Sequence, residues 1–277
     1  MVLTHDRVIV FDTTLREGEL VPGIRFDLPQ KIEIARQLER VGVEIIEVGY
    51  PGKSEKDLSE MVQISQQIDR AILCGLARTE SSEILKVVRA IKAAPRGRIH
   101  LYSNVRLPPQ LHPEIVLGEI ETHVRLARTY CDDVQWSAFD ATRSDRQFLC
   151  RAISIAIENG ATTIGIPDSL GVALPDEFSS LIQIILELVP HLDRAILSVH
   201  CHDDRHCAAD NTIAALNCGA RQIECTIDGL GPRKGNTDLA RILRAIADRT
   251  QLKTSIRTQL LPELSAYLHQ TLPQNIL

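Results

Sequence analysis

VIVFDTTLREGELVPGIRFDLPQKIEIARQLERVG, residues 8–42, contains the pattern that decides the fold. Its first seven residues, 8–14, form a β-branched run that is typical of a buried strand. In residues 28–42, apolar side chains recur at three-residue steps, at Ile32, Ala35, Leu38 and Val41. That period is typical of an amphipathic helix. The stretch therefore predicts one strand followed by one helix.

The same unit recurs along the whole chain. Eight runs predict strands at 8–14, 44–50, 71–78, 98–105, 133–140, 163–169, 195–202 and 222–229. Helical periodicity predicts helices near 28–42, 54–69, 80–94, 113–131, 144–160, 175–189, 205–219 and 236–248. Eight strand–helix units predict an α/β fold in which a parallel sheet closes into a (β/α)8 TIM barrel.

The predicted barrel accounts for almost all of the chain, because such barrels usually have about 250 residues. We expect residues 1–250 to form the barrel and residues 251–277, with Pro262 and Pro273, to form a short C-terminal helical appendage. The alternative fold is an open, doubly wound sheet. That fold needs a glycine-rich phosphate turn after the first strand, and residues 13–18, TTLREG, do not provide one.

Composition excludes several classes of protein. The 277 residues include 31 Lys and Arg against 36 Asp and Glu, which gives a net charge of −5 and argues against a nucleic-acid partner. No apolar run is long enough to span a membrane, and the N-terminus lacks the pattern of a signal peptide. Seven cysteines without a C-x-x-C pair favour a reducing, cytoplasmic location.

Several predicted strands carry polar side chains that should face the barrel interior. Alternate residues of a strand share a face, so His200 and His202 point inward together while Cys201 points toward the helices. The same rule can place Glu47, His100 and Ser137 inside, and it can align Glu224, Thr226 and Asp228 on the last strand. A buried polar group without a partner costs about 1–3 kcal/mol. These groups therefore indicate a functional site at the C-terminal mouth, where the active sites of such barrels lie.

The H-x-H pair at His200 and His202 suits a divalent metal, although the motif alone is a weak signal. Glu17, just past the first strand, could supply a carboxylate oxygen, and Asn236, after the last strand, a neutral oxygen. Arg16 could pair with Glu47 or with an anionic substrate. The alternative interpretation of Arg16 and Glu17 is a solvated ion pair in a loop.

With these residues identified, the chain resembles the family of 2-isopropylmalate synthases and homocitrate synthases, from Phe11 to about Pro273. The matching stretches are FDTTLREGE (11–19), EVGYP (47–51), CGLAR (74–78), RIH (98–100), DATRSDRQFLCR (140–151), IPDSLG (166–171), SVHCHDD (198–204) and GARQIECTIDGLGPRKGN (219–236). The resemblance implies a TIM barrel that binds one divalent metal ion (Mn²⁺, Mg²⁺ or Zn²⁺). It also implies a Claisen-type condensation of an acyl-CoA, such as acetyl-CoA, with a 2-oxo acid.

The resemblance assigns a role to each matching residue. The implied metal ligands are Glu17, His200 and His202, with Asn236 close by. Arg16 would polarise the ketone of the 2-oxo acid, and Glu47 would hold Arg16 in place. The implied substrate-binding residues are His100, Ser137 and Ser169.

The sequence departs from the family pattern at three places. Leu20 replaces a glutamine, Phe139 replaces a glutamate, and Arg205-His206 replaces a Leu-Gly pair. Together these changes indicate an altered pocket or a relaxed constraint.

The source of the general base is a further difference. In the family, a histidine-containing segment after the barrel supplies that base to a partner subunit, and this sequence ends at Leu277, about where the segment would begin. We therefore expect a homodimer, or a hetero-oligomer with a chain that supplies the base. His206 or Cys207 could be a local substitute, His206 facing the metal if the helix begins early. The competing interpretation makes His206 a surface residue at the helix start.

Two other functions remain open at this point. The chain could be a non-catalytic paralogue or the barrel subunit of a split synthase. It could also be a metal-dependent C–C lyase or aldolase. The loop 229–236 lacks the reactive cysteine of hydroxymethylglutaryl-CoA lyases, which argues against that particular lyase.

Overall fold

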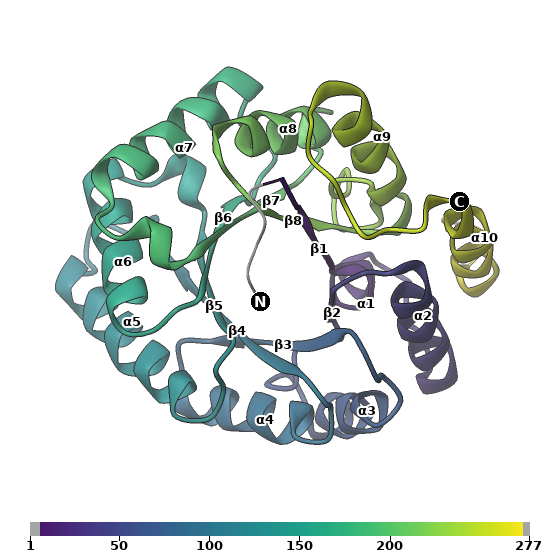
Figure 1. The fold of residues 1–277 in the computed structure, drawn as a ribbon. Coiled ribbons are helices and arrows are strands. Elements are labelled where there is room, and N and C mark those ends of the chain that lie inside the picture. Colours follow the sequence, from purple (N-terminus) through teal and green to yellow (C-terminus); the bar gives the residue numbers. More distant parts are fainter. Residues whose placement is uncertain (1–5, 274–277) are drawn as a thin grey trace.

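The computed structural model describes residues 6–273, in which eight parallel strands form a closed barrel in the order β1 to β8 (Figure 1). The strands are β1 (Ile9–Asp12), β2 (Ile45–Glu47), β3 (Ile72–Arg78), β4 (Gly97–Asn104), β5 (Val134–Phe139), β6 (Thr163–Asp168), β7 (Ile196–Cys201) and β8 (Gln222–Cys225). The α-helices of this part of the chain are α1 (Thr14–Glu17), α2 (Leu28–Val41), α3 (Glu55–Ser65), α4 (Ser81–Ile91), α5 (Pro113–Arg128), α6 (Arg146–Glu158), α7 (Pro175–Leu188), α8 (Ala208–Cys218), α9 (Leu239–Arg249) and α10 (Leu261–Thr271). The prediction of a TIM barrel is confirmed, and the doubly wound alternative is wrong.

Each predicted strand is present, but the first, the second and the last end two to four residues earlier than predicted, at Asp12, Glu47 and Cys225. After β1, the carboxylate of Asp12 accepts hydrogen bonds from the backbone N–H (2.9 Å) and the hydroxyl (3.0 Å) of Thr14. These bonds turn the chain into α1. After β8, a 3-10 turn at Ile227–Gly229 replaces the predicted strand end.

Asp228 shows the consequence of the early end of β8. The alternation rule placed its side chain inside the barrel, and this prediction was wrong. Asp228 is exposed and pairs with Ser265 (2.6 Å) and His269 (3.0 Å) of α10. The rule failed because Asp228 lies in a turn with a positive φ of 54° and not in a strand.

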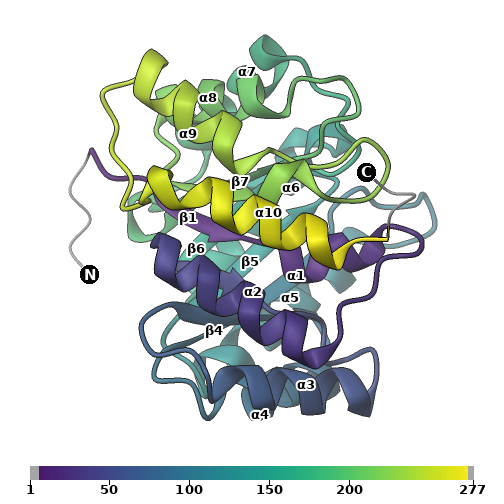
Figure 2. The ribbon, with the colours of Figure 1, turned by 90° about the vertical axis from the view of Figure 1, so that its right-hand side faces the viewer.

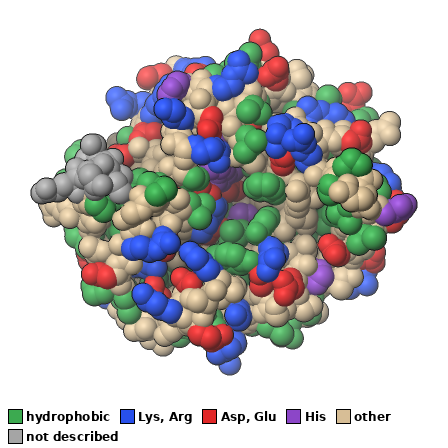
Figure 3. All heavy atoms as spheres, turned by 180° about the vertical axis from the view of Figure 1, so that it is seen from behind, with side chains coloured by type: hydrophobic (Ala, Val, Ile, Leu, Met, Phe, Trp, Pro, Cys, Tyr) green, Lys and Arg blue, Asp and Glu red, His purple; other side chains and the backbone are tan. Residues whose placement is uncertain are grey.

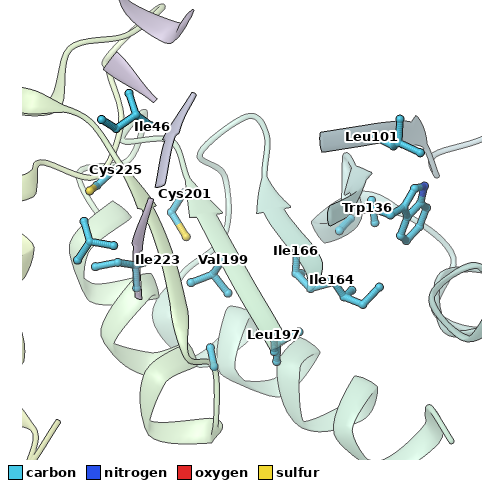
Figure 4. Packing of buried hydrophobic residues seen from close by; sticks show 14 of the residues in the cluster. Ile46, Leu101, Trp136, Ile164, Ile166, Leu197, Val199, Cys201, Ile223 and Cys225 are labelled. Atoms are coloured by element: carbon cyan, nitrogen blue, oxygen red, sulfur yellow. The ribbon is translucent and has the colours of Figure 1, made fainter. Parts of the chain in front are cut away.

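The apolar core forms two layers around the strands. The larger layer lies between the strands and the helices, and Figure 4 shows part of it, including Leu197, Val199 and Cys201 of β7. Cys201 is 1% exposed within this layer, so the predicted facing of β7 is confirmed. The smaller layer lies inside the barrel and consists of Ile9, Phe11, Ile45, Ile72 and Cys74.

The segment after α9 runs along the outside of the barrel. The backbone of Lys253 bonds to Asp6 and Val8 beside the start of β1 (2.8 Å each). Helix α10 then packs beside α2 (Figure 2). The division of the chain into a barrel (1–250) and an appendage (251–277) stays a prediction, and its outermost residues, 1–5 and 274–277, lie outside the described residues. No helix within residues 6–273 is both long and apolar enough to cross a bilayer.

Candidate active site

A cavity of about 770 Å³ opens at the C-terminal mouth of the barrel. Figure 3 shows this hollow face, with histidine and acidic side chains at the base of the hollow and apolar side chains around it. Seven of the nine predicted site residues line the cavity: Arg16, Glu17, His100, Ser137, Ser169, His200 and His202. The other two contact lining residues, Asn236 at 3.1 Å from His200 and Glu47 at 2.6 Å from Arg16.

Glu17, His200 and His202 come together at the base of the cavity. Their ligand atoms all lie within 4.8 Å of one another, and each residue is buried. Asn236 joins the group, because its Oδ1 lies 3.1 Å from Nε2 of His200 and its Nδ2 lies 3.4 Å from Oε2 of Glu17. A carboxylate on α1 and two imidazoles, one on β7 and one directly after it, thus surround one point, as a divalent cation requires.

The state of His202 fits a bound cation. Its Nδ1 is buried and makes no hydrogen bond. Burial, together with the charges of His200, Arg233 and Arg16, lowers the pKa of His202 to about 2. The imidazole is therefore neutral, which is the form that binds a metal. The residues present fit a divalent metal ion.

Glu224 on β8 orients His200. Its carboxylate accepts hydrogen bonds from His200 Nδ1 (2.9 Å), from Ser198 Oγ (2.9 Å) and from Gln135 Nε2 (2.6 Å). Burial alone would raise the pKa of Glu224, but the hydrogen bond and charge of His200 outweigh it and lower the pKa to about 2. The carboxylate is therefore ionised and directs Nε2 of His200 toward Asn236.

The hydrogen bonds continue from Glu224 down the barrel axis to Arg98. Gln135 accepts from Gln222 (2.8 Å) and from Arg98 (2.9 Å), and Arg98 pairs with Asp133 (2.8 Å) near the opposite end. Sequence analysis placed Glu224 inside the barrel but assigned it no role, and it missed Arg98. A charged residue within an apolar strand was the available signal.

Arg16 is held by two carboxylates. Its Nε donates to Oε2 of Glu47 (2.6 Å), and Nη1 pairs with Glu17. The side chains of Arg16 and Glu17 are 15% and 4% exposed, so the interpretation as a solvated ion pair was wrong. Burial alone would raise the pKa of Glu47, but the charges of Arg16 and His100 outweigh it and hold the pKa below its ordinary value.

His100 bridges Glu47 and Ser137. Its Nδ1 lies 2.7 Å from Oε1 of Glu47, and its Nε2 lies 2.7 Å from Oγ of Ser137. Glu47, Cys74 and His100 also lie close enough together to hold a metal. Burial, with the charge of Glu47, raises the pKa of the Cys74 thiol, and the other two residues are already bonded to Arg16 and Ser137. This group is therefore a poorer metal site than that of Glu17.

Ser169, directly after β6, also lines the cavity. Its hydroxyl accepts a hydrogen bond from the backbone N–H of Asp140 (2.9 Å), and its carbonyl accepts one from Arg233 (2.9 Å). Two of the departures from the family pattern lie at the cavity mouth, where Leu20 and Phe139 are 52% and 42% exposed. They make this part of the mouth apolar.

The remaining departure lies outside the cavity. Helix α8 begins at Ala208, and the side chain of His206 is 75% exposed and faces Asp203 at 3.7 Å. The Cys207 thiol donates to the carbonyl of Arg205 (3.3 Å). The expectation that His206 could face the metal was wrong, because the helix does not begin early; His206 is a surface residue. Neither residue lines the cavity.

Comparisons with known proteins agree with this architecture. The sequence model of the HMGL-like family matches residues 7–268. A 2-isopropylmalate synthase of Afipia carboxidovorans is 44% identical over 249 residues, which cover 88% of this chain and 48% of the relative. One of Rhodopseudomonas palustris is 43% identical over 269 residues, which cover 94% of this chain and 51% of the relative. The chain thus spans about half the length of these relatives.

Solved structures with the same fold include two HMG-CoA lyases. That of Acinetobacter baumannii has a TM-score of 0.81 at 19% identity and covers 98% of this chain and 93% of its own. That of Brucella melitensis has a TM-score of 0.79 at 16% identity and covers 96% of this chain and 98% of its own. At such identities the likeness shows the fold alone. The family match and the 2-isopropylmalate synthases together show that this chain belongs to the HMGL-like family.

Proposed function

We propose that this chain is the catalytic barrel of a metal-dependent acyltransferase that condenses an acyl-CoA, most simply acetyl-CoA, with a 2-oxo acid. The observation that carries the proposal is the buried convergence of Glu17, His200 and His202 beside Arg16. The 2-isopropylmalate synthases, which are 42–44% identical, support the reaction type. In this reaction the acyl methyl group loses a proton and its carbon bonds to the ketone carbon. The C=O electron pair moves to oxygen, which takes a proton, and water then cleaves the thioester to release CoA.

A divalent ion held by Glu17, His200 and His202, with Asn236 beside it, would act as a Lewis acid toward the ketone of the 2-oxo acid. The protein's own contribution is to hold these ligands in fixed positions. Glu224 fixes the ring of His200 through Nδ1, so that Nε2 is free for the ion.

Arg16 is proposed to stabilise the negative charge that develops on the ketone oxygen. Because Nε and Nη1 are held by Glu47 and Glu17, the guanidinium has one orientation, and Nη2 is available to donate to the substrate. A donor that is fixed before the reaction gains catalytic power because it does not need to reorganise. Glu47 is a positioning residue for Arg16.

His100, Ser137 and Ser169 are proposed to bind the 2-oxo acid. His100 and Ser137 share a hydrogen bond of 2.7 Å on one wall, and the Ser169 hydroxyl still has the capacity to donate. The substrate carboxylate would accept hydrogen bonds from these groups while its side chain extends toward the apolar mouth.

The general base is proposed to come from another polypeptide, either a second copy or a different chain. Among the described residues near the cation position, the carboxylates of Glu17, Glu47 and Glu224 and the ring of His100 are already held by other side chains. None of these groups is placed to take a proton from the acyl carbon without breaking its own contact.

The test is an assay of CoA release. The protein is freed of metal, reloaded with Mn²⁺, Mg²⁺ or Zn²⁺, and supplied with acetyl-CoA and a panel of 2-oxo acids. The proposal expects metal-dependent release of free CoA with at least one oxo acid. Metal and oxo-acid binding without CoA release would favour a split-synthase subunit. The proposal would be overturned if the folded protein retained no metal and if added metal did not change its binding of ligands.

A further inference from the structure

Two aromatic side chains lie between the proposed binding residues of the 2-oxo acid and the mouth of the cavity. Tyr102 follows His100 by two positions on β4, and Phe139 follows Ser137 by two positions on β5. Alternate residues of a strand share a face, and all four side chains line the cavity. Because two residues of a strand advance by about 7 Å, the aromatic pair lies one such step nearer the mouth than the pair of His100 and Ser137.

Tyr102 and Phe139 pack against each other across β4 and β5. Their ring centroids lie 6.2 Å apart, and the ring planes are inclined by 59°. This is a favourable geometry for a tilted aromatic pair. Phe139 nevertheless remains 42% exposed, on the wall of the cavity. The pair therefore offers an open aromatic surface on which a further ring can pack.

The cavity lining around this pair includes further apolar side chains. Leu76 of β3 lies beside His100 in the register of the two strands, and it lines the cavity together with Leu20 and Leu170. Figure 3 shows apolar side chains next to the hollow. A volume of about 770 Å³ leaves ample space for a large substrate side chain.

The polar neighbours of the aromatic pair are neutral or already paired. Arg78, which lies beside Tyr102 in strand register, donates to Glu83 (2.8 Å). Asn104, which lies beside Phe139, is neutral, and its Oδ1 accepts a backbone N–H (2.9 Å). Within residues 6–273, therefore, β3, β4 and β5 place no unpaired cation at this level to receive a second carboxylate of the substrate.

The other cations of the cavity lining were considered for the same role. Lys31 pairs with Glu60 (2.8 Å), and Arg233 pairs with Asp204 (2.9 Å). Lys53 makes no side-chain contact in the described part of the chain, but it is exposed and lies in the loop between β2 and α3. A dicarboxylic 2-oxo acid would have to reach Lys53, and the experiment below includes such an acid for this reason.

We propose that the 2-oxo acid accepted by this chain carries an aromatic side chain, which packs on Tyr102 and Phe139. This inference rests on the proposed function, because it places the carboxylate and the ketone of the substrate beside His100, Ser137 and the cation position. From there, a ring attached through one methylene group extends toward the mouth and meets the aromatic pair. A short aliphatic side chain would leave the pair uncovered.

Isothermal titration calorimetry on the whole chain in the presence of Mn²⁺ tests this inference. The probes are phenylpyruvate, 3-methyl-2-oxobutanoate, pyruvate and 2-oxoglutarate. We expect phenylpyruvate to bind at least about tenfold more tightly than each of the others, because its ring buries the most apolar surface. Equal or tighter binding of one of the other acids would overturn this inference and leave the proposed function standing. Binding of none of the four at millimolar concentration would overturn the proposed function and this inference with it.

Phe139→Ala locates the side chain of the substrate. We expect this variant to bind phenylpyruvate about tenfold or more weakly and to bind pyruvate within about twofold of the original affinity. The matched control is Tyr130→Ala, an exposed aromatic residue after α5 that does not line the cavity. Circular dichroism shows that each variant is folded. Unchanged binding of phenylpyruvate in Phe139→Ala, or an equal loss for pyruvate, would overturn the inference.

Discussion

Nδ1 of His200 lies 2.9 Å from Oε2 of Glu224, and Nε2 of the same ring lies 3.1 Å from Oδ1 of Asn236. One nitrogen is thus used for orientation, and the other faces the proposed cation. Glu224 on β8 is itself held by Ser198 of β7 and Gln135 of β5, so the acceptor that orients the His200 ring is fixed in place. This arrangement is typical of a metal-binding histidine with a supporting carboxylate.

Glu224→Gln should therefore weaken metal binding without removing a proposed ligand. Loss of the charged acceptor leaves the His200 ring less well oriented and less basic. We expect affinity for Mn²⁺ or Zn²⁺ to fall by about 10–100-fold, measured by competition with a chelator. The control is Glu121→Gln on the exposed surface of α5. Unchanged affinity in Glu224→Gln would show that the carboxylate does not support the metal site.

The sequence was sufficient to predict which side chains enter the barrel, because alternation along a strand is a local property. Glu47, His100 and Ser137 lie on β2, β4 and β5, and the structure joins them by hydrogen bonds of 2.7 Å. The prediction for Asp228 failed because β8 ends at Cys225 and Asp228 lies in a 3-10 turn, to which strand alternation does not apply. The sequence could not predict the hydrogen-bonded connection from Glu224 to Arg98, because this connection depends on the register between strands and on closure of the barrel.

His200→Ala and Cys201→Ala separate the two faces of β7. His200 is proposed to bind the metal, whereas Cys201 packs against the helices. We expect His200→Ala to abolish retention of metal through gel filtration, while Cys201→Ala retains it and loses only some thermal stability. Metal content is measured by inductively coupled plasma mass spectrometry. Equal metal loss in both variants would mean that retention reflects general stability and not ligation.

Arg16→Lys tests whether the fixed guanidinium acts on the reaction and not on the metal. Lysine keeps the charge but cannot contact Glu47 and Glu17 through two nitrogens at once. We expect kcat for CoA release to fall by about 10²–10³-fold, with metal affinity within about threefold of the original. Arg106→Lys, an exposed arginine near the same mouth, is the control. A parallel loss of metal affinity would assign Arg16 to the metal site instead.

Asp12 should make the stability of the protein depend on pH. Burial raises the pKa of Asp12 from 3.8 to about 7, despite its hydrogen bonds to Thr14. The folded state therefore binds the proton more tightly than the unfolded state. The resulting stability is present below the unfolded pKa and is lost as the pH rises from about 4 to about 7. The asparagine side chain of Asp12→Asn does not ionise, so this variant should not lose stability in this way as the pH rises.

The measurement is the free energy of unfolding in urea at a series of pH values between about 4 and about 8. Because other groups titrate in both proteins, the informative quantity is the difference between Asp12→Asn and the original chain. That difference should increase in favour of the variant as the pH rises and level off above about 7. Asp248→Asn, at an exposed position of α9, should give no such trend. Parallel stability curves for Asp12→Asn and the original chain would show that the carboxyl of Asp12 ionises as readily in the folded protein as in the unfolded chain.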